Sequence, residues 1–331
     1  MRHLNILGRR AALALGAALV LAPNIASAQA AYPSKPITLV VPFSAGGPTD
    51  VVARVIGAAM TKHLNQTVVV ENKVGAGGTL AAAYVARATP DGYTFLIHHN
   101  GMATAPALYR KLPYNPLSDF EYVSQVIDVP MTLVGRKDLP AKDFNELRAW
   151  LKANGDKANL AHAGLGAVSH LCGMLFRQAV GADITTVPYQ GTGPAMNALL
   201  AGQVDLLCDQ TTSTTQYIKA GSVKLYGVTT DARIRTLPSA PTLNEQGLKG
   251  FEVVVWHGIY APKGTPKEAI DKFGAALKAA LKDPAVDKRL DELGAVTVPN
   301  FKQSPDGLKN WLSKETARYA PVIKAAGQFA D

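Results

Sequence analysis

Residues 43–50, Phe-Ser-Ala-Gly-Gly-Pro-Thr-Asp, join a β-rich apolar run (37–43) to an amphipathic run (48–64). Residues 75–79, Gly-Ala-Gly-Gly-Thr, follow the next β-rich run (68–71) in the same manner. Pro48 fits the first turn of a helix, because its missing N–H would be unpaired there anyway. A strand that ends in a glycine-rich turn and leads into a helix is typical of parallel sheets with crossover helices. The sequence therefore predicts an α/β protein.

The same alternation extends along most of the chain. A long extended stretch, 120–136, interrupts it and is broken by Pro130, after which the strand–helix pattern restarts. A second apolar strand at 253–260 returns the chain to the first part, so two crossings form a hinge between two lobes. The other predicted strands are 94–98, 159–163, 186–189, 204–208 and 223–229, and the other predicted helices are 79–88, 143–154, 169–180, 194–201, 267–281, 284–293 and 305–326.

The first thirty residues have the layout of a secretory signal peptide. Three arginines precede an uncharged apolar run (11–22), and Pro23 follows it. The run is shorter than the roughly 20 residues that a membrane span needs. Small residues predict cleavage after Ala28 or Ala30 and a periplasmic location. An uncleaved anchor and export by the twin-arginine route, suggested by Arg9-Arg10, are the alternatives.

Charge and length narrow the class of protein. Without residues 1–30 the chain keeps 31 basic and 25 acidic residues, a net charge of +6 that is dispersed along it. No cluster of Lys and Arg interleaved with aromatic residues occurs, so we expect no nucleic-acid partner. No repeat, low-complexity tract or further hydrophobic span stands out. About 300 residues exceed one comfortable core, which favours two lobes, and we expect a monomer.

Two cysteines, Cys172 and Cys208, are present. In an oxidising compartment such a pair can form a disulfide, and two isolated buried thiols are the alternative. The sequence leaves this choice open, because it does not give the Cα separation of roughly 4.4–6.8 Å that a disulfide requires.

Glycine-rich turns at strand ends predict an anion site. Ligands of open α/β sheets bind at the carboxyl ends of strands, and helix N-termini there offer unpaired N–H donors and partial positive charge. Neither turn contains the Gly-Lys-Ser/Thr of a P-loop or the full dinucleotide fingerprint, so phosphate is a poorer candidate ligand. The candidate ligand-binding residues on this side are Phe43, Ser44, Ala45, Gly46, Gly47, Thr49, Asp50, Ala76, Gly77, Gly78, Thr79, His99 and Asn100.

The second part of the chain contains a similar set of turns. Its candidate ligand-binding residues are Ala163, Ser169, His170, Tyr189, Thr192 and Asp209. His170 in the first turn of a helix would tend to be neutral, and a packing histidine is an equal alternative. On the first side, Asp50 is expected to accept hydrogen bonds that organise its turn, since its charge would repel an anion.

Catalytic and metal-binding patterns are missing from the sequence. It contains no Gly-x-Ser-x-Gly elbow, no His-Glu-x-x-His and no Cys/His set with zinc spacing. His98 and His99 are adjacent at a strand end and are expected to point to opposite faces, which disfavours a shared metal. Ser44 has no local base that would make it a nucleophile. We therefore expect no enzymatic activity, no cofactor and no metal.

The motifs together resemble the extracytoplasmic solute-binding receptors of tripartite tricarboxylate transporters, often called the Bug or TctC family. The resemblance covers essentially the whole chain after the signal peptide. It rests on Tyr32-Pro33-x-Lys35-Pro36-Ile37, Val41-Pro42-Phe43 with Gly46-Gly47 and Asp50, Glu71-Asn72-Lys73 with Gly75-Ala76-Gly77-Gly78, Ala88-x-Pro90-Asp91-Gly92-Tyr93-Thr94, Val187-Pro188-Tyr189-x-Gly191 and Gly202-Gln203-Val204-Asp205.

The resemblance implies a type II periplasmic-binding-protein fold that closes like a flytrap. It implies that residues 31–130 with 251–331 form a lobe that anchors a carboxylate through backbone amides, and that residues 131–250 form a lobe that sets specificity. The ligand would be a small mono- or dicarboxylate, aromatic acids included, which is handed to a membrane permease. The family often has Ser or Thr where this chain has Ala167, so a hydroxyl contact from this position is not expected here. A sensory receptor for a carboxylate is the alternative function.

Overall fold

The computed structural model describes residues 31–327. The expected signal peptide and both of its cleavage sites lie outside this range. The chain divides into two units, of which the first ends at Ser34 and the second begins at Lys35. In the first unit the described residues are 31–34, with a cis peptide bond between Tyr32 and Pro33.

A ten-stranded sheet organises the second unit, in the order β2-β1-β3-β9-β4-β7-β5-β6 with β10 and β8 also paired to β4. Strands β1, β2 and β3 are parallel, as are β5, β6 and β7, whereas β9 and β4 are antiparallel to their neighbours. The strands are β1 Ile37–Val41, β2 Val68–Asn72, β3 Thr94–His98, β4 Phe120–Arg136, β5 Asn159–His162, β6 Thr185–Pro188, β7 Leu206–Gln210, β8 Val223–Val228, β9 Val254–Pro262 and β10 Val296–Thr297.

Strand β4 divides the sheet because it changes partners about two-thirds of the way along. Up to Pro130 it pairs with β9, and from Met131 onward it pairs with β7 and β8. We call β1, β2, β3, β9, β10 and the first part of β4 the first half-sheet, and β5, β6, β7, β8 and the rest of β4 the second half-sheet. The expected break at Pro130 is wrong. The strand continues through this residue, which lies opposite Val254 at the start of β9, where the exchange of partners occurs.

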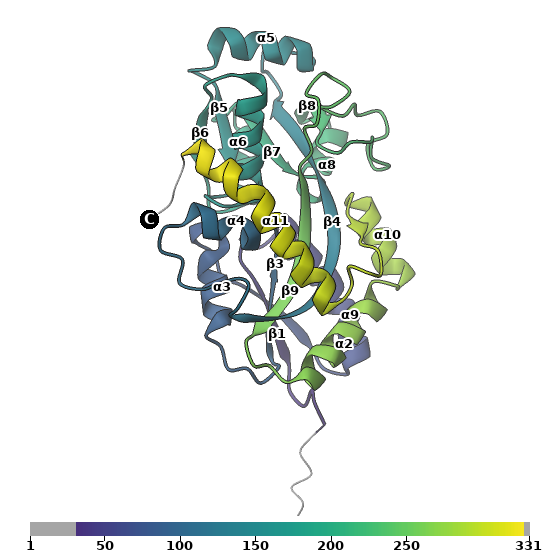
Figure 1. Cartoon of the computed structure of the whole chain (residues 1–331). Coiled ribbons are helices and arrows are strands. Elements are labelled where there is room, and N and C mark those ends of the chain that lie inside the picture. The colour runs from purple at the N-terminus through teal and green to yellow at the C-terminus, as the bar shows by residue number, and fades with distance from the viewer. Residues whose placement is uncertain (1–30, 328–331) are drawn as a thin grey trace, which may run out of the picture. The chain divides into compact units, whose positions relative to one another are not determined.

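Helices cover both half-sheets (Figure 1), and most begin and end within three residues of the predicted bounds. They are α2 Pro48–Leu64, α3 Thr79–Ala86, α4 Gly101–Leu108, α5 Phe144–Asn154, α6 Val168–Val180, α7 Thr192–Leu200, α8 Thr211–Lys219, α9 Lys267–Ala280, α10 Pro284–Glu292 and α11 Pro305–Ala326. The sequence did not predict α4 and α8. Helix α4 contains Pro106, and α8 opens with five hydroxyl residues of low helix propensity.

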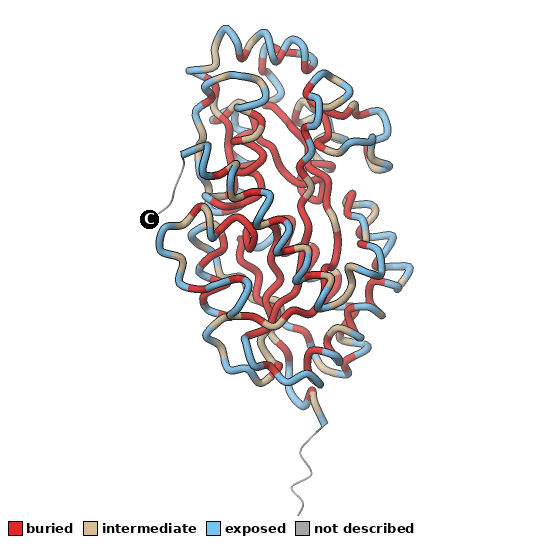
Figure 2. The backbone as a smooth tube through the Cα atoms, in the orientation of Figure 1, coloured by how far each residue is buried: buried red, intermediate tan, exposed pale blue. Residues whose placement is uncertain are grey.

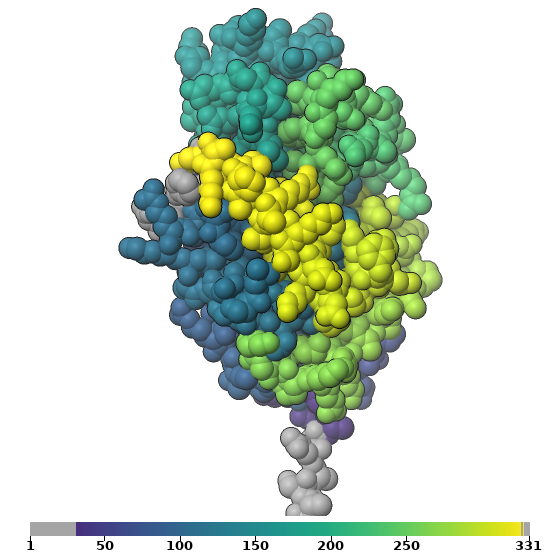
Figure 3. Space-filling view, viewed as in Figure 1, coloured from purple at the N-terminus to yellow at the C-terminus, as the bar shows by residue number. Residues whose placement is uncertain are grey.

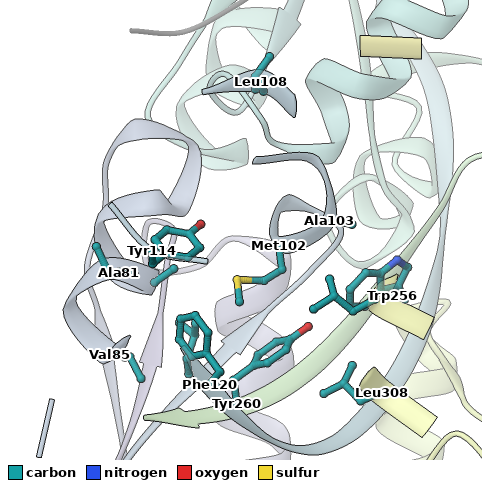
Figure 4. Packing of buried hydrophobic residues seen from close by; sticks show 14 of the residues in the cluster. Ala81, Val85, Met102, Ala103, Leu108, Tyr114, Phe120, Trp256, Tyr260 and Leu308 are labelled. Carbon is teal, nitrogen blue, oxygen red and sulfur yellow. The ribbon is translucent and has the colours of Figure 1, made fainter. Parts of the chain in front are cut away.

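The C-terminal helix α11 belongs to a large cluster of buried residues. Leu308 and Leu312 pack there with Tyr260 of β9, and the same cluster includes Leu171 and Met174 of α6. Figure 4 shows its aromatic centre, and Figure 3 shows α11 in yellow lying across this face of the molecule. The tube in Figure 2 is red along most of the strands, so the core follows the sheet. Helix α11 therefore packs against elements of both half-sheets.

Cys172 of α6 and Cys208 of β7 form a disulfide, with a Cα–Cα distance of 6.1 Å. The structure thus has the bridge that the sequence left open. It links a helix to the strand on which that helix packs, within the second half-sheet. None of the helices between residues 31 and 327 combines the length and the apolar character needed to cross a bilayer.

Candidate ligand-binding site

A cavity of about 440 Å³ lies between turns that follow strands of the two half-sheets. The first half-sheet contributes the turns after β1 and β2, and the second contributes those after β5 and β6. The lining residues are Pro42, Phe43, Val74, Gly75, Ala76, Gly77, Gly78, Tyr109, Ala163, Gly164, Leu165, Pro188, Tyr189 and Gln190. Six candidate residues are among them: Phe43, Ala76, Gly77, Gly78, Ala163 and Tyr189. None of the lining residues carries a formal charge at neutral pH, so an anion here would be held by backbone dipoles and neutral side chains.

Asp50 organises the turn after β1. Its carboxylate accepts the Gly46 N–H (2.8 Å), the Arg54 Nε–H (2.9 Å) and an amide N–H of Asn72 (2.9 Å). The same Asn72 amide group donates to the Phe43 carbonyl, which ties the end of β2 to this turn. Burial tends to raise the pKa of Asp50, but these hydrogen bonds together lower it. The structure gives Asp50 the local role that the sequence predicted.

Left-handed glycines shape the turn after β2. Gly77 and Gly78 have φ angles of +61° and +97°, which side-chain-bearing residues rarely adopt. The Thr79 hydroxyl donates to the Ala76 carbonyl (2.9 Å) and closes the turn. A Cβ on Gly78 would lie 2.7 Å from Nε2 of His98 and 3.0 Å from Cβ of Pro42. Backbone therefore approaches the imidazole closely at this turn.

Three buried histidines lie beneath the two glycine-rich turns. The ring of His99 stacks on Phe43 with centroids 4.7 Å apart, and the Thr49 hydroxyl lies 3.1 Å from Nε2 of His257. Burial lowers the pKa of His98 to about 4, that of His257 to about 3 and that of His99 well below its usual range. These imidazoles are neutral at physiological pH and act as packing groups that support the turns.

The expectation that His98 and His99 point to opposite faces is wrong. Their ring centroids are only 5.0 Å apart, because β3 ends at His98 and strand alternation no longer applies to His99. Their Nδ1 atoms accept backbone N–H groups, of His99 and Gly101 respectively. No group of three or more potential metal ligands occurs among residues 31–327.

Asn100 holds α4 against β9. Its side chain donates to the Val254 carbonyl and accepts the Trp256 N–H, both at 3.0 Å. Both ends of the amide thus bond to the backbone of the strand that returns from the second half-sheet. This contact, which sequence spacing does not indicate, fixes the turn after β3.

On the side of the second half-sheet, Ser169 and His170 lie in the first turn of α6 and contact the turn after β5. The Ser169 hydroxyl accepts the Ala163 N–H at 2.8 Å, and Nδ1 of His170 lies 3.5 Å from the Gly166 nitrogen. The ring of His162, at the end of β5, lies 4.7 Å from that of His170. Burial, together with His170, lowers the pKa of His162 to about 4. Ser169 and His170 therefore shape the turn from behind and are not among the cavity-lining residues.

A buried carboxyl group connects the other two turns of the second half-sheet. The Thr192 hydroxyl, at the start of α7, donates to Oδ2 of Asp209 at 2.7 Å, and the Gln210 N–H donates to Oδ1 at 2.7 Å. Burial raises the pKa of Asp209 to about 6, although both hydrogen bonds act against this. Nearby, Oε1 of Gln210 and Oγ1 of Thr212 are buried without a hydrogen-bond partner in the described part of the chain.

The remaining first-side candidates lie at the edge of the site. Ala45 and Gly46 are exposed, and Gly47 caps α2 without lining the cavity. Ser44 contacts the opposite turn, because a Cβ on Gly191 would lie only 2.3 Å from its hydroxyl oxygen. That oxygen is buried and has no hydrogen-bond partner within residues 31–327. The turns after β1 and β6 thus meet face to face.

The helices that follow the parallel strands begin without side-chain caps. None of the six helices that follow the parallel strands, α2, α3, α4, α6, α7 and α8, has a side-chain cap within the described chain. By contrast, Asp143, Asp283 and Ser304 cap α5, α10 and α11, and α9 begins uncapped after Pro266. Uncapped N-termini combine free N–H groups with the positive end of the helix dipole, and together they suit a carboxylate.

Tyr109 and Leu165 are site residues that the sequence reading missed. Tyr109 follows the unpredicted helix α4, and its hydroxyl lies 2.7 Å from the Ala76 carbonyl oxygen and 2.8 Å from that of Leu165. Leu165 lies in the turn after β5, between two glycines. The sequence signal for Tyr109 is the third strand-to-helix turn of the first part, after the strand 94–98, because a helix that follows this strand also begins at the site.

The fold and the site together define a class: a two-lobed α/β binding protein of type II periplasmic-binding-protein architecture, with β4 and the segment leading into β9 as its two crossings. The chain is similar to the solved periplasmic binding protein BugD, with 50% identity, a TM-score of 0.88 and coverage of 91% of this chain and all of that one. It is also similar to MatC from Rhodopseudomonas palustris solved with malate, at 42% identity and a TM-score of 0.85, covering 88% of this chain and 100% of that chain.

Residues 52–328 match the model of the tripartite tricarboxylate transporter family receptor, and the chain belongs to this family. A protein of Agrobacterium vitis, encoded in the TAR-I ttuE–ttuC′ intergenic region, is 51% identical over 306 residues, which cover 92% of this chain and 88% of that protein. The family and the fold seen by sequence resemblance are thereby confirmed. Members of this family are periplasmic solute-binding receptors, and that class and location apply to this chain.

Proposed function

We propose that this receptor binds a small carboxylate in the cavity between its lobes, closes over it and delivers it to the membrane permease of a tripartite tricarboxylate transporter. The observation that carries the proposal is an uncharged cavity lined by glycine-rich turns that lead from strand ends into helices without side-chain caps. Backbone N–H groups of this kind bind a carboxylate most strongly once closure has excluded water.

Similar proteins support the chemistry of the ligand. One neighbour was solved with malate, and an R. palustris protein that is 34% identical was solved with adipate. We propose that residues 31–130 with 251–331 form the lobe that anchors the carboxylate and that residues 131–250 set specificity. A ligand that touches both lobes binds the closed form better and so increases its population. The permease would then recognise the closed form of a monomeric receptor.

A thermal-shift panel of carboxylic acids tests the proposal. It should contain malate, adipate, citrate and aromatic acids, each beside its neutral amide at the same concentration. An acid at 100 times its Kd should add about 2.7 kcal/mol to the free energy of unfolding and raise Tm, whereas the amide should raise it less. If no acid raised Tm, or if amides matched their acids throughout, carboxylate binding would be excluded.

Binding without turnover is the second part of the proposal. The bound acid should be recovered unchanged after long incubation with the pure protein, as measured by chromatography of the mixture. Consumption of the acid at a rate proportional to protein concentration would show an enzyme instead. Reconstitution with the permease in vesicles tests delivery, because uptake should then require the receptor.

A further inference from the structure

Tyr109 contacts turns of both lobes, and the proposed function gives it no role so far. It follows α4 at the end of the turn region after β3, and its ring lines the cavity. Its hydroxyl lies within hydrogen-bond distance of the Ala76 carbonyl, on its own side, and of the Leu165 carbonyl, on the other. One side chain thus contacts both walls of the cleft.

A phenol hydroxyl has a single proton, so it can donate fully to only one of these two carbonyls. The Ala76 carbonyl already accepts the N–H and the hydroxyl of Thr79. The Leu165 carbonyl has Tyr109 as its one hydrogen-bond donor within residues 31–327. A hydrogen bond from Tyr109 to the Leu165 carbonyl therefore contributes more free energy than one to the Ala76 carbonyl, because the Leu165 carbonyl would otherwise be unpaired in the closed cleft.

The surrounding contacts show that the opposing turns fit closely at this point. A Cβ on Gly166 would lie 3.3 Å from the ring of Tyr109, and Thr104 of α4 places its hydroxyl 3.4 Å from the Gly166 carbonyl. On the other side of the hydroxyl, Gly77 comes so near Leu165 that no side chain would fit between them. Two hydroxyl groups from α4 and its end therefore reach the same turn of the opposite lobe.

We infer that Tyr109 is an interlobe latch. In the closed form its proton bonds to the Leu165 carbonyl, and in the open form it bonds to the Ala76 carbonyl, so the hydroxyl is never left unpaired. The latch lowers the free energy of the closed form and slows release of the ligand. This inference rests on the proposed closure of the two lobes, but not on the identity of the ligand. Tyr109 acts here as a positioning residue, since its role is to hold the two turns together.

Interlobe distance measurements test the latch directly. Spin labels on Arg87→Cys, after α3, and Thr185→Cys, in β6, place one exposed label on each half-sheet, with the native disulfide retained. Pulsed electron paramagnetic resonance would give the distance distribution without ligand and with saturating malate or adipate as probes. In Tyr109→Phe the ratio of short to long distances should fall about five-fold, the equilibrium factor of one neutral hydrogen bond. Dissociation of a bound probe should accelerate by a similar factor.

Tyr114→Phe is the matched control, because the Tyr114 hydroxyl is buried and has no hydrogen-bond partner in the described chain. This variant should keep the wild-type distribution. Thr104→Val removes the weaker hydroxyl contact to the same turn and should shift the distribution in the same direction by less. If Tyr109→Phe does not fold, the distance distribution of Thr104→Val tests the latch in its place.

The possible outcomes distinguish a failure of the latch from a failure of the proposed carboxylate binding. A shift to longer distances in ligand-free Tyr109→Phe supports the latch even if no acid of the thermal-shift panel binds. A distribution identical in the wild type, Tyr109→Phe and Tyr114→Phe would overturn it. So would a wild-type protein without any short-distance population, alone or with either probe.

Discussion

The cavity lies in a cleft with two walls: the turns of the first half-sheet form the first wall, and those of the second half-sheet form the second wall. Both walls consist of strand-turn-helix units, but their side chains differ in chemistry. On the first wall, the polar side chains of Asp50, Thr79 and Asn100 bond to nearby backbone or to Arg54 and Asn72 and do not line the cavity, which leaves the glycine backbone of the turns as the polar surface. On the second wall, Thr192 and Asp209 form a buried, titratable pair and a disulfide holds α6 to β7. Backbone N–H groups suit a carboxylate that all ligands share, whereas side chains can differ between receptors and so select one ligand over another. This difference supports the proposed division, in which the first wall anchors the carboxylate and the second sets specificity.

Gly77→Ala should have the largest effect, because it tests whether the walls must meet. A Cβ on Gly77 would overlap the Leu165 carbonyl oxygen of the opposite wall. We expect binding of the best acid in the panel to weaken on the order of a thousandfold, equivalent to about 4 kcal/mol. Isothermal titration calorimetry measures this. Gly181→Ala is the matched control, because its φ of +63° is like the +61° of Gly77 but no atom lies within 4 Å of the added Cβ.

Similar Tm values for the two variants would show that Gly77→Ala acts on closure and not on folding. Equal affinities would contradict the closed arrangement of the turns. Substitution of Gly78 by valine would be a less suitable test of closure. That change would collide with His98 and Pro42 within the first wall, so it would disturb folding as well as binding.

Removal of the disulfide should destabilise the second wall selectively. Cys172 and Cys208 are 36 residues apart, and closing a loop of this size is expected to stabilise the folded chain by about 4 kcal/mol. Urea unfolding of the double alanine variant should show this loss, and a reducing agent should produce a similar loss in the wild type only. A variant as stable as the wild type would show that α6 and β7 pack firmly without the bridge.

Asp209→Asn should stabilise the receptor above pH 6. The folded pKa of about 6 lies above the usual 3.8, so Asp209 favours folding fully below pH 3.8 and that contribution is lost as pH rises to about 6. At pH 7.5 the variant should gain about 3 kcal/mol over the wild type, and near pH 4 the two should be alike. Denaturant titrations across pH measure the difference. Asp231→Asn, at an exposed position, is the control. A gain that does not vary with pH would refute the assignment.

The first wall should show the opposite and smaller pH dependence. The folded pKa of His98, about 4, lies below the unfolded value of 6.5, so its contribution is complete above pH 6.5 and is lost as pH falls toward 4. At pH 5.5 the loss should be ~1.4 kcal/mol. His98→Asn should remove this part of the acid sensitivity, and the exposed His63→Asn should not. An unchanged profile in His98→Asn would mean that other groups control acid unfolding.

Local sequence patterns were sufficient for much of the fold. The bounds of α2, β3, β4 and α11 agree with the predicted ranges, because amphipathic spacing, Pro48 and runs of β-branched residues act over a few neighbouring residues. Helix α8 could not be predicted in this way. It begins with Thr and Ser residues of low helix propensity, and buried contacts such as that between Thr132 and Thr214 stabilise it.

The site was predictable as a set of turns but not as a set of contacts. Glycines at strand ends marked both walls, because a backbone conformation leaves a local trace in the sequence. The neighbours of those turns leave none: His257 is 208 residues from its partner Thr49. Likewise, Tyr109 acquires significance only because Leu165 faces it across the cleft. Such pairs depend on how the lobes meet.

The position of β9 in the sheet has a consequence for how the chain assembles after export. Val254–Pro262 lies between β3 and β4, so the first half-sheet has a gap until the last third of the chain has emerged. Every strand of the second half-sheet lies within residues 120–228, which emerge earlier. In a chain that is delivered N-terminus first, the second lobe can complete before the first. The order of assembly is then the reverse of the order of the sequence, and the unpaired edges of β3 and β4 are the surfaces that need protection meanwhile.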